Sequence, residues 1–124
     1  MATASKMKVH AIDASFYTVK DIDKCTKFYS AILGFEPTLT YQDIVREWTF
    51  PGGESFGIYK SPEGQASGSG VMFQVDDVAA AVEAAKAFGV KFDEDGGTIE
   101  ETPVCHMAFA QDPDGNRFML HKRK

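Results

Sequence analysis

The residues with the clearest chemical potential lie near the end of the chain. Arg117 and His121 fall on a stretch with strand character, 117–122, and their even spacing puts both side chains on one face. A guanidinium can hold a carboxylate or phosphate through two hydrogen bonds, and a histidine can exchange a proton near neutral pH. The pair predicts recognition of an acid, or acid–base catalysis. The competing interpretation is solvated charge, because the chain closes on HKRK.

Cys105 and His106 form a second candidate pair, since a neighbouring histidine can activate a thiol. Adjacent strand residues point to opposite faces, however, so the imidazole should not reach the sulfur. We therefore interpret Cys105 as a small buried thiol and His106 as a hydrogen-bonded core residue. His10 is interpreted as a surface residue.

An internal repeat must position these residues. VKDI at 19–22 recurs as VDDV at 75–78, and each copy opens a helical pattern that ends just before a glycine, Gly34 or Gly89. The predicted helices span 22–33, capped by Asp21, and 78–88, capped by Asp77. Strands are predicted over 11–18, 36–41, 44–50, 55–60, 71–75, 90–92, 98–101, 105–111 and 117–122.

The repeat also includes the last hairpin of each half, where Pro51-Gly52-Gly53 parallels Pro113-Asp114-Gly115. The sequence therefore predicts an α+β fold of two tandem βαβββ modules, with curved mixed sheets and helices outside. We expect a single domain, 1–124, with modules at about 9–60 and 70–122. The segment 61–69, rich in glycine, serine and proline, is the predicted linker.

Composition excludes several classes of partner. The 124-residue chain carries a net charge of −5, and its longest basic run is the closing Lys122–Lys124, so nucleic-acid binding is not expected. No apolar run is long enough to span a bilayer, and the first residues lack a signal core, so we expect a cytoplasmic protein without a membrane partner. Two cysteines make no disulfide framework.

Three segments carry a family likeness: VKDIDKCTKFYSAILGF at 19–35, GVMFQVDDVAAAVEAAKAFG at 70–89 and DPDGNRFML at 112–120. With the paired modules, they resemble the vicinal oxygen chelate superfamily of glyoxalases, bleomycin-resistance proteins and extradiol dioxygenases. The resemblance implies that paired modules form each ligand cavity. Because half-sheets leave edges that need covering, we also expect a homodimer, with pairing either within a chain or by exchange.

Metal-using relatives take four His or Glu ligands from cavity-facing positions, two in each half. By the resemblance these positions correspond to Ala14, Gly57, Gly70 and Met119. Alanine and glycine offer no donor, and a thioether is too soft for zinc, nickel or magnesium. The resemblance therefore implies a member of the fold that has lost its metal site, and we expect neither a metal nor another cofactor.

Strand alternation predicts what lines the cavity instead. The candidate ligand-binding residues are mostly methionine and aromatic side chains, with Arg117 and His121 as candidate catalytic or anchoring groups. The ligand-binding set is Phe16, Trp48, Met72, Gln74, Met107, Phe109 and Met119. Such a mixture is typical of small-molecule pockets, although methionine also fills solid cores, so an open pocket and a filled cavity both remain.

Three functions fit this pattern. The leading hypothesis is a metal-independent protein that binds a small aromatic or amphipathic ligand. The alternative is an enzyme of the lyase, isomerase or dioxygenase type, related to lactoylglutathione lyase, with a non-standard site. An assembly module without a small ligand is the third. Nothing in the sequence identifies the ligand.

Overall fold

A computed structural model describes residues 7–61, 63, 68, 70–93 and 97–124. Most of the predicted linker at 61–69 therefore lies outside the described residues. The element order confirms the predicted α+β class: the first half is βαβββ, and the second half follows the same plan with one additional short strand after its helix. The elements are β1 (Ala14–Val19), α1 (Ile22–Leu33), β2 (Leu39–Tyr41), β3 (Val45–Thr49), β4 (Ser55–Lys60), β5 (Val71–Gln74), α2 (Val78–Ala87), β6 (Lys91–Phe92), β7 (Glu100–Glu101), β8 (Cys105–Gln111) and β9 (Arg117–Arg123).

Both helices begin where the sequence predicts, because an aspartate caps each one. The carboxylate of Asp21 accepts from Lys24 N and that of Asp77 accepts from Ala80 N. Helix α1 ends at Gly34, whose φ of 86° is a left-handed conformation that suits glycine. Helix α2 ends at Ala87, one residue before the predicted end.

The two sheets share one plan. In the first the strand order is β1-β4-β3-β2, and in the second it is β5-β9-β8-β6, with β7 also pairing with β8. The first strand of each module runs parallel to the last, and the other pairs are antiparallel. The predicted ends need small corrections: β1 starts at Ala14 instead of residue 11, and β2 at Leu39 instead of residue 36.

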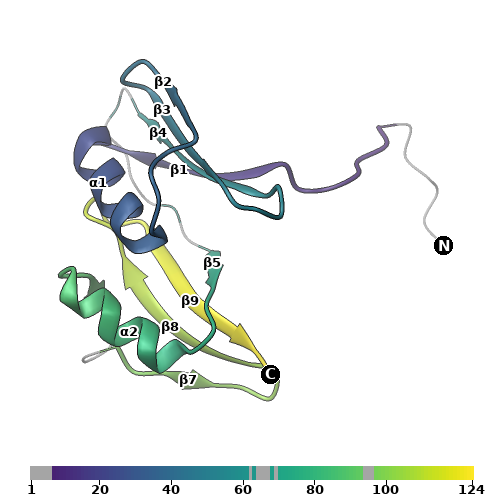
Figure 1. Ribbon diagram of the computed structural model, residues 1–124, viewed down its shortest axis with the longest axis vertical. Helices are drawn as coiled ribbons and strands as arrows, with labels where there is room; N and C mark the ends of the chain where they lie inside the picture. The colour runs from purple at the N-terminus through teal and green to yellow at the C-terminus, as the bar shows by residue number, and fades with distance from the viewer. Residues whose placement is uncertain (1–6, 62, 64–67, 69, 94–96) are drawn as a thin grey trace.

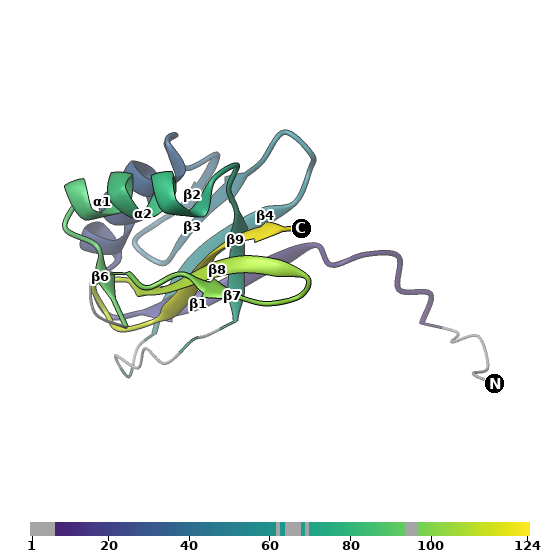
Figure 2. The same cartoon turned by 90° about the horizontal axis from the view of Figure 1, so that it is seen from below.

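The core lies between the sheets and the helices, which both cover the same side (Figures 1 and 2). Its centre is Tyr29 of α1, whose fully buried ring contacts aromatic rings from both modules. The ring centroids of Phe56 and Phe118 lie 4.7 Å and 6.2 Å from that of Tyr29. Neither described helix is long and apolar enough to cross a membrane.

Hydrogen bonds from the first module to the β8–β9 turn join the two modules. The carboxylate of Asp114 accepts from the backbone amides of Lys20 and Asp21, at 2.6 Å and 3.0 Å. Asn116 Nδ2 donates to Thr18 O at 2.9 Å. The DPDGN segment thus sets the tight turn and also positions the start of α1 against it.

Candidate functional site

The candidate site is the face of the two sheets turned away from the helices, called here the open face. In β1, Tyr17 and Val19 are buried under α1, so Phe16 and Thr18 point the other way. In the neighbouring strands, Gly57 of β4 pairs with Phe16, and Glu47 of β3 pairs with Gly57, so the three residues form a row across the open face. The first module therefore presents an aromatic ring and a carboxylate on the open face.

The second module brings together seven of the predicted residues. The register pairs Met72 with Met119 and Met119 with Phe109 in one row. A neighbouring row runs from Gln74 through His121 to Met107. Arg117 precedes Met119 by two residues, which keeps its side chain on this face. The predicted combination of methionine, aromatic and polar groups thus shares one sheet surface.

A small cleft opens on this surface beside β5 and the end of β9. Its volume is about 280 Å³, and Met72, Gln74 and His121 line it together with Lys122 and Arg123. Met72 is 52% exposed, whereas Met119 in the adjacent strand is buried. A ligand placed here would contact the Met72 side chain and the His121 imidazole, with two cationic residues close by.

Arg117 has a partner that the sequence pattern does not predict. Its Nε donates to Asp93 Oδ2 at 2.6 Å, and its Nη2 forms an ion pair with the same oxygen. The guanidinium carbon lies 5.6 Å from the ring centroid of Phe109, a cation–π arrangement. Asp93 comes directly after the predicted strand at 90–92. An acidic residue at the end of that strand was the one sequence feature that could have suggested a partner for Arg117. The ion pair and the ring together hold the Arg117 side chain over the open face.

Trp48 corrects one prediction. Its side chain is fully buried on the helix side of β3, where Nε1 donates to Phe35 O at 3.1 Å. The prediction that Trp48 lines the cavity is therefore wrong, and Arg46, two residues before it, lies on the same helix-facing side of β3. That arginine is buried too, and it donates to the carbonyl oxygens of Gln42 and Val45. Glu47 occupies the open face instead of Trp48.

Cys105 and His106 do not form a reactive pair. His106 Nδ1 lies 2.7 Å from Glu101 Oε1, and the buried Cys105 Sγ lies 3.1 Å from Thr102 Oγ1. The hydrogen bond from His106, aided by that from Lys124, holds the pKa of the Glu101 carboxyl below its usual value. His106 is thus hydrogen-bonded as predicted, but its side chain is 36% exposed and does not lie in the core.

The four positions that correspond to metal ligands do not fit a divalent ion. Ala14, Gly57 and Gly70 carry no donor atom, and Met119 carries only a thioether. The ring of Phe16 also lies over Gly57, so that even a β-carbon there would overlap it. In the described parts of the chain, no three side chains of the metal-ligating types gather within reach of one ion.

Comparison with known families agrees with this fold. Residues 9–120 match the Glyoxalase/Bleomycin resistance protein/Dioxygenase superfamily, and the chain belongs to that superfamily. Among characterised sequences, it is 30% identical over 120 residues to a probable lactoylglutathione lyase from Vibrio parahaemolyticus, covering 86% of each chain. It is 28% identical to a lactoylglutathione lyase from Haemophilus influenzae, covering 86% of this chain and 87% of the relative.

Solved structures of the same fold include proteins of different function. An antibiotic binding protein from a Streptomyces species superposes with a TM-score of 0.78 at 22% identity, covering 95% of this chain and 99% of that one. A lactoylglutathione lyase from Agrobacterium tumefaciens superposes with a TM-score of 0.73 at 16% identity, covering 93% and 95%. At these identities the likeness establishes the fold, and function must be argued from the site.

Proposed function

We propose that the protein binds a small aromatic or amphipathic acid on the open face of the second module without using a metal. The observation that carries the proposal is the strand register that places Met72, Phe109 and Met119 beside Arg117 and His121. Apolar side chains with a few convergent polar groups are typical of ligand sites. The Streptomyces neighbour, an antibiotic binding protein, supports a binding role for this fold.

The polar end of the ligand is assigned to Arg117. Its guanidinium has five N–H donors, and the contacts with Asp93 involve only Nε and Nη2. Among the residues that the structure describes, no other acceptor engages the guanidinium, so its remaining donors could serve an incoming carboxylate. Asp93 keeps the side chain in one orientation but also offsets part of its charge, so we expect micromolar rather than nanomolar affinity, about −8 kcal/mol.

We further propose that a second copy of the chain covers the open face. Large apolar side chains on it are left in water, most of all Tyr41 at 57% exposed and Met72 at 52%. Phe16, Leu39 and Tyr59 on the same face are also exposed. Extended apolar surface of this kind is typical of an interface. Dimerisation would turn each open face into a closed cavity, and sedimentation at micromolar concentration should show a dimer.

An enzymatic function is the second candidate. The specific observation in its favour is the 30% identity to a probable lactoylglutathione lyase over most of both chains. The lack of donors at Ala14, Gly57 and Gly70 argues against a metal-dependent reaction at the corresponding site. Assays of lactoylglutathione lyase activity with and without added nickel or zinc test this candidate directly. Activity that depends on the metal would favour the enzyme over the binder.

The binding proposal is tested by titrating metal-free protein with a panel of aromatic carboxylates and their neutral amides. Amide chemical shifts in ¹⁵N-labelled protein locate the bound compound. We expect the carboxylates to shift the amides of Met72, Gln74 and Phe109, and the neutral amides to bind more weakly. Binding that requires an added metal, or shifts confined to other surfaces, would contradict the proposal.

A further inference from the structure

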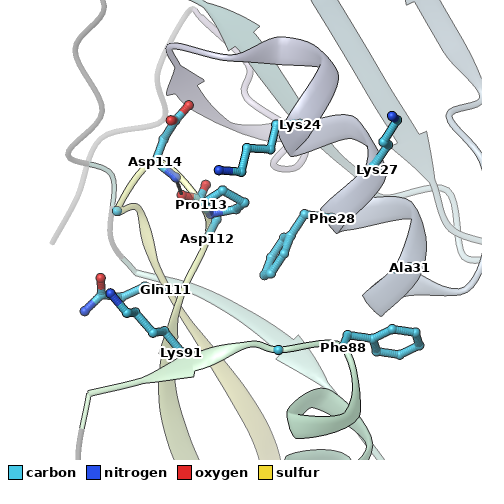
Figure 3. A pocket seen from close by; sticks show the side chains of 12 residues that line it. Lys24, Lys27, Phe28, Ala31, Phe88, Lys91, Gln111, Asp112, Pro113 and Asp114 are labelled. Carbon is cyan, nitrogen blue, oxygen red and sulfur yellow. Dashed lines mark hydrogen bonds between the residues drawn. The ribbon is translucent and has the colours of Figure 1, made fainter.

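A larger cleft lies on the opposite side of the sheets, among the helices. It has a volume of about 720 Å³ and is bounded by α1, the connection from α2 to β6, and the β8–β9 turn. Figure 3 shows Phe28 turned into its centre and Lys24 extending across it toward Pro113. Lys27 on α1 and Lys91 on β6 line opposite walls. None of these residues contributes to the open face.

The floor of this cleft is apolar and firmly held. Phe28 is half-buried and packs edge-on against Tyr29 and Phe118, with ring centroids 5.2 Å and 6.0 Å away. Phe88, just after α2, is 58% exposed at the edge of the cleft. Covering an exposed phenylalanine ring with an apolar group is favourable, because it removes apolar surface from water. An apolar ligand in the cleft would cover both rings.

Positive charge surrounds this apolar floor, although the whole chain carries a net charge of −5. Within the described residues, Lys24, Lys27 and Lys91 take part in no ion pair. The two carboxylates of the cleft wall already accept hydrogen bonds from the protein. Asp114 accepts from two backbone amides, and Asp112 accepts from Tyr29 and Asn116. The three ammonium groups thus remain available to an anion from outside.

We propose that this cleft binds an organic anion in which a carboxylate or sulfonate is attached to an apolar body. The lysines would hold the anionic group, and Phe28, Phe88 and Pro113 would cover the apolar part. The volume lies within the range of roughly 300–1,000 Å³ usual for small-molecule pockets, which favours a compact ligand over an acidic peptide. This site is independent of the open face, because the two lie on opposite sides of the sheets.

The test uses the full chain, labelled with ¹⁵N, and 2-naphthoate as the probe. We expect 2-naphthoate to shift the amides of Phe28, Phe88 and Gly89, with a weaker effect from the neutral 2-naphthylmethanol. Because each exposed ion pair contributes only a small part of the binding free energy, the double variant Lys27→Gln/Lys91→Gln should bind the probe about two- to thirtyfold more weakly. Lys60→Gln is the matched control, because Lys60 is exposed and does not line the cleft.

A second variant, Phe88→Ser, separates the apolar contribution from the charge. It should weaken 2-naphthoate and 2-naphthylmethanol alike, and its amide spectrum reports whether the fold is kept. The proposal is overturned if 10 mM 2-naphthoate leaves the cleft amides unshifted, or if the double lysine variant binds as well as Lys60→Gln. It is also overturned if a short polyglutamate peptide shifts these amides while 2-naphthoate does not. Shifts at Met72 and Gln74 report the open face separately.

Discussion

The hydroxyl of Tyr29 donates a 2.8 Å hydrogen bond to Oδ2 of Asp112, linking the first module's helix to the second module's closing turn. Tyr29 is fully buried, and Asp112 is only 5% exposed. The same carboxylate accepts from the backbone amides of Asp114 and Asn116 and from Asn116 Nδ2. Burying a carboxylate is costly unless donors surround it, and here the donors come from both modules.

The first prediction is that Tyr29→Phe destabilises the protein by about 1–3 kcal/mol, because Asp112 loses a donor while it stays buried. Urea unfolding followed by circular dichroism measures the change. Thr40→Val is the matched control, since it removes a hydroxyl from an exposed residue of β2, and its free energy of unfolding should change by less than about 0.5 kcal/mol. Equal effects of the two substitutions would show that the hydrogen bond to Asp112 contributes little.

The second prediction concerns alkaline pH. Burial and the nearby Asp112 carboxylate raise the pKa of the Cys25 thiol and that of the Tyr29 hydroxyl. A group with a raised pKa in the folded state contributes stability that is present below its unfolded pKa and is lost as the pH rises. The free energy of unfolding should therefore fall above about pH 8.5, where an unfolded cysteine ionises, and more steeply above about pH 10.

Two variants separate these contributions. Cys25→Ala should flatten the decline between about pH 8.5 and 10, whereas Tyr29→Phe should flatten it above about pH 10. Unfolding in urea at a series of pH values measures both. A stability that stays constant up to pH 11 in the parent protein would contradict the assignment.

The helices were predictable because their signals are local. Asp21 and Asp77 are followed by apolar residues at helical spacing, and Gly34 and Gly89 lie just past the ends, so no tertiary information was needed. The face of β3 was not predictable in this way. Val45, Glu47 and Thr49 alternate with Arg46 and Trp48, and each set contains one apolar and one charged residue. Only packing against α1 decides that Trp48 is inside.

The site shows the same limit. The residues of β5, β8 and β9 could be placed on one face because their alternation is regular and their pairing follows from the repeat. Asp93 could not be placed beside Arg117, because it lies just after the short strand β6, where strand pairing no longer determines which residues are neighbours. The cleft between α1 and β6 was also beyond the sequence, since it depends on how two modules pack.

The third prediction follows from the burial of Trp48. Its emission should be that of a buried indole, with little quenching by acrylamide, and should shift to longer wavelength on unfolding. An aromatic carboxylate bound on the open face should leave this emission almost unchanged, because the ring lies on the other side of β3. Strong quenching by a saturating ligand would indicate contact with the core, contrary to the proposed site.

The fourth prediction concerns a restored metal site. The variant Ala14→His/Gly57→Glu/Gly70→His/Met119→Glu supplies four donors, but the ring of Phe16 occupies the space above Gly57. We therefore expect nickel or zinc to bind only when Phe16→Ala is added, as measured by calorimetry and by metal content after desalting. Gly70 has a φ of 101°, so Gly70→His should also cost about 1–3 kcal/mol of stability. Tight binding to the parent protein at these positions would refute the correspondence.

The last prediction tests how Arg117 holds an acid. Arg117→Ala should weaken an aromatic carboxylate by roughly 1.5–3 kcal/mol and barely change its neutral amide, because only the acid uses the charged hydrogen bond. Asp93→Asn should strengthen the acid, since the guanidinium would no longer share its charge with a neighbouring carboxylate. Lys60→Ala, a charge removed from another strand, should leave both compounds unaffected. Titration calorimetry compares the eight affinities of the parent protein and the three variants for the two compounds. Equal losses for acid and amide in Arg117→Ala would assign the guanidinium to packing over Phe109 instead of recognition.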